Sequence, residues 1–152
     1  MGAHRFDRVK SVFWNGVLLS LGTTAAASLV VVLIPGFLMS IFVSDPEVIA
    51  IGTLYLRILA VGYLFFAVTF VSNGIINGSG HTLATTMFTL VSLWIIRIPL
   101  AAFLAEMTGK IENIWLSIVI SFAVLMLISL VYYARGNWQK GLGNAPYRST
   151  AG

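Results

Sequence analysis

The sequence contains no cysteine and few charged residues, with nine basic and five acidic side chains among 152 residues. Without cysteine there are no disulfides, no thiol chemistry and no cysteine-ligated iron–sulfur cluster. No paired carboxylates lie within a long apolar run, and the acids and two histidines form no cluster with metal-ligand spacing. No nucleophile has a base at usable spacing either. The sequence therefore predicts neither an enzyme nor a protein that holds a metal or cofactor.

Apolar residues are abundant instead, at 59% of the chain with a mean hydropathy of +0.96. Four long apolar runs contain them: 12–43, 48–72, 83–105 and 114–134. About 20 apolar residues, rising about 1.5 Å each, cross the hydrocarbon core of a bilayer. Charged residues make up 9% of the chain, against about 25% in a soluble domain. The sequence predicts an all-α integral membrane protein with four transmembrane helices.

Basic residues gather outside the first and last runs. They are Arg5, Arg8 and Lys10 on one side and Arg135, Lys140 and Arg148 on the other. An even number of spans puts both termini on one face, which the positive-inside rule makes cytoplasmic. The net charge of +4 then reflects membrane orientation rather than nucleic-acid binding, and the lipid bilayer is the expected partner. Residues 1–135 are predicted to form the transmembrane part and 136–152 a polar cytoplasmic tail.

Prolines mark expected irregularities along the runs. Pro35 lies late in the first run, where a missing backbone donor predicts a kink or break. Asp45 and Pro46 have the residue types of a helix cap and a first helical position, so a helix start is expected there. Pro99 leaves the carbonyl of Ile95 without its usual partner, which predicts irregular backbone nearby.

Small residues recur at helical spacing in two places. The first run carries Gly16, Ser20, Thr24 and Ser28, one every four residues. Small side chains on one face allow helices to approach closely in lipid, so helix packing is predicted there, with a substrate-lining face as the alternative. Gly74 and Gly78 form a GxxxG pair with the same predicted packing role. They lie in the segment 73–82, which is predicted to be a cytoplasmic connection.

Two arginines interrupt the apolar runs. Arg57 and Arg97 each lie about 12–14 Å from the outer end of their run, at 1.5 Å per residue. A charge at the bilayer centre costs about 2.5–3.5 kcal/mol. Each side chain either reaches the outer headgroups or faces a polar cavity and binds groups of other helices. No acid lies in the four runs, so buried arginines would find their partners outside this chain. Together with Asn73 and Asn77, the two arginines are candidates for a substrate or ion pathway.

An ordered set of short segments carries a family resemblance. The segments are Gly2-Ala3-x-Arg5-x-Asp7-Arg8, Phe42-x-x-Asp45-Pro46-Glu47-Val48, Tyr55-Leu56-Arg57-Ile58, Asn77-Gly78-Ser79-Gly80-His81-Thr82, Arg97-Ile98-Pro99-Leu100-Ala101 and Asn113-Ile114-Trp115. Together they resemble the multidrug and toxic compound extrusion (MATE) transporters over roughly residues 1–135. The resemblance is to the last four helices of a twelve-helix, two-lobe transporter.

The resemblance implies antiport driven by H⁺ or Na⁺, which exports amphipathic and often cationic compounds across a bacterial inner membrane. The remaining helices of the transporter are implied partners. Members that couple ions in the second lobe often carry an acid in the helix matching 48–72, and this chain has none there. Coupling then uses acids outside this chain or takes place in the first lobe.

Two other classes of protein fit four apolar helices. One is a small structural or assembly protein bound to a larger membrane complex. The other is a compact four-helix exporter that works as a dimer. Such an exporter needs a membrane-embedded acid for proton exchange, and the absence of one from the runs counts against it. The leading hypothesis is the C-terminal part of a multidrug antiporter, expected to be inactive on its own.

Overall fold

The structure is a computed structural model that describes residues 6–136, and the regular elements in that range are all helical. The elements are α1 (Phe6–Leu33), α2 (Pro35–Ser40), α3 (Pro46–Gly78), α4 (Thr82–Leu90), the π-helical η1 (Val91–Arg97), α5 (Ile98–Thr108) and α6 (Ile111–Ala134). The predicted tail at 136–152 lies outside the described residues, apart from Gly136.

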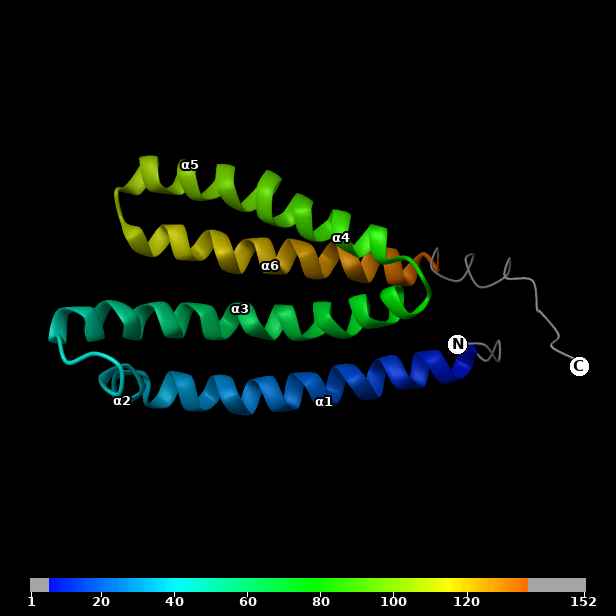
Figure 1. Ribbon diagram of the computed structural model, residues 1–152, viewed down its shortest axis with the longest axis horizontal. Coiled ribbons are helices and arrows are strands. Elements are labelled where there is room, and N and C mark those ends of the chain that lie inside the picture. Colours follow the sequence, from blue (N-terminus) through cyan, green and yellow to red (C-terminus); the bar gives the residue numbers. More distant parts are fainter. Residues whose placement is uncertain (1–5, 137–152) are drawn as a thin grey trace, which may run out of the picture.

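Four helices in the described range are long and apolar enough to cross a membrane, which confirms the predicted fold class. These spans are Arg8–Leu33, Pro46–Gly78, Thr82–Met107 and Ile111–Ala134, the third of which joins α4, η1 and α5. The long helices lie side by side, with α3 between α1 and α6 and the third span beyond α6 (Figure 1). The start of α1 and the end of α6 lie at the same end of the bundle (Figure 1).

Two predicted helix boundaries in the first half are confirmed. α1 ends at Leu33 and α2 begins at Pro35, because proline cannot supply the backbone donor that a continuous helix needs. α3 begins at Pro46, and the carboxylate of Asp45 accepts a hydrogen bond from the Glu47 backbone N–H at 2.9 Å. A carboxylate at this position satisfies one of the free N–H groups that every helix start leaves unpaired.

The predicted connection at 73–82 is wrong in its extent. α3 continues through Gly78, and only Ser79–His81 separate it from α4. The polar composition suggested a loop, but the side chains of Asn73 and Asn77 are occupied by hydroxyls of other helices and leave the backbone free to stay helical. The chain turns where Gly80 takes a φ of +89°, a conformation that glycine adopts without strain.

The backbone ahead of Pro99 is irregular, as predicted. Val91–Arg97 form a π-helix between two α-helical stretches of the third span. Pro99 has no N–H for the carbonyl four residues earlier, and a π-helix shifts the bonding to residues five apart. The wider turn therefore ends at Arg97, two residues before the proline.

A cluster of buried apolar side chains lies near the end of the bundle where α1 begins and α6 ends. Phe13 and Val17 of α1 pack with Ile75 of α3, and the ring of Phe13 stacks on Tyr133 of α6 at 4.2 Å between centroids. Elsewhere many large apolar side chains are exposed, including Leu18, Leu19, Phe37, Trp94 and Phe103. Lipid tails are as apolar as leucine, so such side chains suit a surface that faces a bilayer.

Candidate functional site

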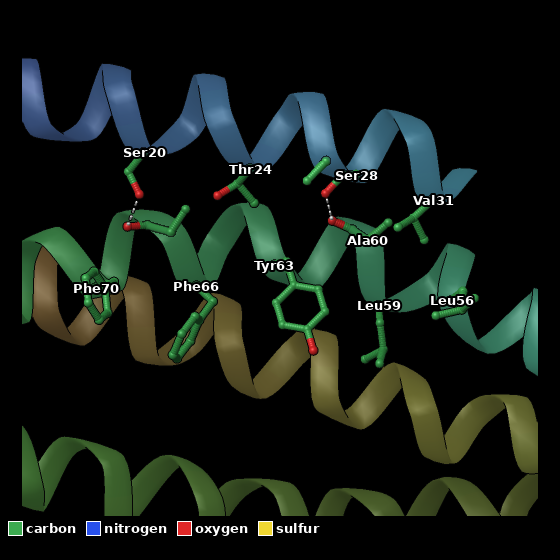
Figure 2. Close-up of a pocket in the computed structure, with 12 residues that line it drawn as sticks. Ser20, Thr24, Ser28, Val31, Leu56, Leu59, Ala60, Tyr63, Phe66 and Phe70 are labelled. Carbon is green, nitrogen blue, oxygen red and sulfur yellow. Dashed lines mark hydrogen bonds between the residues drawn. The ribbon is translucent and has the colours of Figure 1, made fainter. Parts of the chain in front are cut away.

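An open groove of about 490 Å³ runs between α1 and α3 (Figure 2). Two serines of α1 line it and bond to the backbone of α3. Ser20 Oγ donates to the Ala67 carbonyl at 3.5 Å, and Ser28 Oγ donates to the Ala60 carbonyl at 3.3 Å. Thr24 lies between these two serines and lines the same groove. Both bonds are longer than the usual 2.7–2.8 Å for hydroxyl donors, so they hold the two helices only weakly.

Aromatic side chains of α3 form one wall of this groove. Tyr63, Phe66 and Phe70 line it and are all more than a third exposed. Figure 2 shows the ring of Tyr63 projecting from α3 away from α1, with its hydroxyl towards α6. Phe122 of α6 packs against Phe66 at 5.2 Å and Tyr63 at 6.4 Å between ring centroids. The groove thus combines aromatic surface with a few hydroxyls, which suits an amphipathic molecule.

Arg97 lies against α6. Its Nε donates to Ser121 Oγ at 2.9 Å, and its guanidinium lies 5.1 Å from the centroid of the Phe122 ring. Its Nη2 atom is buried and has no hydrogen-bond partner among the described residues. A buried donor left unpaired costs about 1–3 kcal/mol, and more when the group is charged. The side chain therefore makes one good hydrogen bond and one cation–π contact, while its buried Nη2 has no hydrogen-bond partner among the described residues.

Short hydrogen bonds hold the π-helical segment to α6. Ser92 Oγ donates to the backbone carbonyl of Ser121 at 2.7 Å, so Ser121 bonds both Ser92 and Arg97. Ser117, Ser121 and Ser129 are almost fully buried on one face of α6. Sequence reasoning missed these serines and Ser92. Their signal is present, because 117, 121 and 129 differ by multiples of four and therefore share a helix face.

Asn73 and Asn77 bond to other helices near the end of the bundle where α1 begins. Asn73 Oδ1 accepts from Ser129 Oγ at 2.9 Å, and Asn77 Oδ1 accepts from Thr85 Oγ1 at 2.5 Å. Ser129 lies eight residues from the serine that bonds Arg97, about 12 Å along α6. The structure therefore does not bring the asparagines together with Arg97.

Arg57 differs from Arg97 in its surroundings. It is exposed on α3, and it makes no hydrogen bond or ion pair within residues 6–136. Lysine and arginine side chains in such positions extend along apolar surface towards the headgroups. Of the two candidate arginines, only Arg97 has its guanidinium in contact with another helix of the described residues.

The predicted packing glycines also differ from one another. A Cβ built on Gly16 would lie 3.2 Å from Val71 Cγ1, so α1 and α3 approach closely there. A Cβ on Gly74 meets nothing within 4 Å, and Gly78 is exposed. The GxxxG pair therefore faces away from the other described helices. Within the described range no group of three or more His, Cys, Asp or Glu side chains forms a metal-binding cluster.

The family model and the individual relatives that match this chain agree with one another. The MatE family model matches residues 1–103. A probable multidrug resistance protein, YpnP of Bacillus subtilis, is 34% identical over 103 residues, which are 68% of this chain and 23% of the relative. The probable multidrug resistance protein NorM of Thermotoga maritima is 28% identical over 135 residues, 88% of this chain and 29% of the relative.

A mammalian relative shows how far the likeness extends. Multidrug and toxin extrusion protein 2 of Oryctolagus cuniculus is 28% identical over 140 residues, 91% of this chain and 23% of the relative. The chain thus spans about a quarter of the length of the curated relatives it matches. Among solved structures there is no significant match.

Proposed function

The chain belongs to the MatE family of membrane transporters, and from that membership we propose that it forms the C-terminal four helices of a cation-coupled multidrug antiporter. The antiporter exchanges H⁺ or Na⁺ for amphipathic, often cationic, compounds in a bacterial inner membrane. Both termini of the chain are cytoplasmic. Support comes from the four spans, the basic residues outside the first and last of them, and the multidrug names of the relatives.

The groove between α1 and α3 is the observation that carries this proposal. It is open, mainly apolar and edged by hydroxyls, which matches molecules with an aromatic body and a polar group. Gly16, Ser20 and Ser28 pack α1 onto α3, and Thr24 contributes a hydroxyl to the groove wall. In the whole transporter the groove forms part of the wall of a substrate cavity.

Cation coupling requires a group that titrates or binds a cation within the membrane. Each of the five acids of this chain lies in or beside the first or last three residues of a helix, and none lies in the middle of a span. The coupling acid therefore belongs to the part of the transporter that this chain does not contain. The same reasoning makes the isolated chain inactive and the other helices its necessary partner.

A chimeric transporter tests the proposal. Residues 1–135 replace the matching segment of the Thermotoga maritima relative, which is 28% identical over 135 residues. The chimera is expressed in an efflux-deficient bacterium, and ethidium efflux is measured by loss of fluorescence. We expect efflux well above that of the relative truncated before the matching segment. A chimera that reaches the membrane in normal amount but exports no dye would contradict the proposal.

A further inference from the structure

Arg97 has a bonding need that the described chain does not meet. Its Nη2 is the only buried side-chain nitrogen or oxygen without a partner among the described residues. The guanidinium is permanently charged, because arginine is not deprotonated in proteins. Ser121, which accepts from Nε, is a neutral hydroxyl and balances none of that charge. The surroundings of Arg97 thus carry one uncompensated positive charge and one buried nitrogen whose N–H groups have no partner among the described residues.

No ion pair joins Arg97 to an acid within residues 6–136. The five acids are Asp7, Asp45, Glu47, Glu106 and Glu112. Glu106 lies nine residues from Arg97 on the same span, about 14 Å along the axis. Glu112 lies equally far along α6 from the serine that Arg97 contacts. A compensating anion must therefore come from outside these four helices.

One aromatic ring connects Arg97 to the groove. The Phe122 ring lies against the guanidinium, and it also packs on Tyr63 and Phe66. Those two side chains line the groove, as Figure 2 shows. Phe122 itself is only half-buried. A molecule with an apolar body on the aromatic wall would bring a polar group across Phe122 to Arg97.

We propose that Arg97 binds a carboxylate at the edge of the groove. A guanidinium offers a planar fork that matches the two oxygens of a carboxylate, and rotation of its outer torsions presents both Nη atoms. The carboxylate comes either from an amphipathic substrate or from an Asp or Glu on a helix elsewhere in the transporter. Only the identity of this occupant rests on the proposed function. A substrate source selects acids and zwitterions, whereas a helix source neutralises Arg97 and leaves the groove open to cations.

The first arm of the test uses a small carboxylate. The purified 152-residue chain is placed in phosphatidylcholine nanodiscs, and binding of 2-naphthoate and of neutral 2-naphthamide is measured by equilibrium dialysis against empty nanodiscs. If substrate supplies the carboxylate, naphthoate binds at least about tenfold more tightly than the amide. That preference disappears in Arg97→Gln and weakens in Arg97→Lys, which keeps the charge but not the fork. Arg57→Gln, which removes the exposed arginine, leaves the preference unchanged.

The second arm supplies the carboxylate from a helix. Labelled apolar peptides of about 22 residues, long enough to span a bilayer, carry one central Glu or one central Gln. Association of each peptide with the chain is measured by energy transfer. If a helix supplies the carboxylate, the Glu peptide binds at least about tenfold more tightly than the Gln peptide, and Arg97→Gln abolishes the difference. Absence of an Arg97-dependent preference in both arms overturns the carboxylate proposal. Neither arm measures transport, so failure here is distinguishable from failure of the chimera.

Discussion

The two halves of the bundle are held together in different ways. Beyond the apolar cluster near the start of α1, α1 and α3 meet through a glycine and two serine hydroxyls whose bonds to carbonyls measure 3.3 and 3.5 Å. The third span and α6 meet at η1 through hydroxyl and guanidinium bonds of 2.7 and 2.9 Å. The first pair leaves an open groove, and the second buries serines almost completely.

The α1–α3 pair therefore offers space for a ligand, whereas the third span and α6 form a more rigid support. In the proposed transporter, long, weak bonds beside an open groove would allow α1 and α3 to adjust around molecules of different shape. Short bonds to buried serines fix η1, and with it Arg97, against α6. Arg97 is thus a charge on the fixed half, close to the groove of the adaptable half. The predictions below test that division, beginning with the largest effect.

The largest expected effect is complete loss of transport when only these four helices are present. The 152-residue chain alone should give no proton- or sodium-driven efflux, because neither half contains an acidic side chain in the middle of a span. Ethidium accumulation in an efflux-deficient strain measures this directly. Dye resistance that depends on the chain alone would show that one of the halves couples ions without help.

Membrane orientation should give a near-complete contrast between two labelling sites. Lys110 lies in the connection between α5 and α6, whereas Lys140 lies beyond the end of α6. With cytoplasmic termini, a cysteine at 110 is labelled by an impermeant maleimide in intact cells and a cysteine at 140 is not. The natural chain has no cysteine, so no background site needs removal. Labelling at 140 alone would reverse the orientation of both halves.

Apolar runs and prolines made much of this fold predictable. The four spans followed from hydropathy, and Pro35, Pro46 and Pro99 marked a break, a start and an irregular segment that the structure confirms. These are local effects, which a sequence states directly. The composition of 73–78 suggested a loop, but this segment is helical. The sequence does not show this directly, because the hydroxyl that bonds Asn73 belongs to Ser129, 56 residues later.

The candidate site was less predictable for a related reason. Arg97 was recognisable from its charge, but its contacts depend on how α6 is rotated about its own axis. The serine spacing on α6 indicates a shared face without saying which helix that face meets. The groove has no sequence signature, since it arises from the distance between α1 and α3.

Substitutions at Arg97 should have a large but partial effect. If a helix elsewhere in the transporter supplies the carboxylate that binds Arg97, we expect Arg97→Leu and Arg97→Lys in the chimeric transporter each to lower ethidium efflux by about tenfold, because neither reproduces a forked guanidinium contact. Thermal stability of the purified variants is measured alongside. Arg57→Lys is the matched control and should be tolerated, since position 57 is exposed and lysine also carries a positive charge that reaches the headgroups. Unchanged efflux and stability in both Arg97 variants would show that this side chain merely faces lipid.

The smallest expected effect concerns packing in the adaptable half. Gly16→Leu places a side chain where a Cβ already lies 3.2 Å from Val71, so α1 must move away from α3. Overpacking of this kind destabilises by about 1–3 kcal/mol. The matched change Gly74→Leu introduces a Cβ with nothing within 4 Å and should change stability by less than about 0.5 kcal/mol. The midpoint of unfolding in sodium dodecyl sulfate compares the two variants. Equal destabilisation would mean that close approach at Gly16 does not hold α1 to α3, and the contrast between the two halves would then rest on the serine bonds alone.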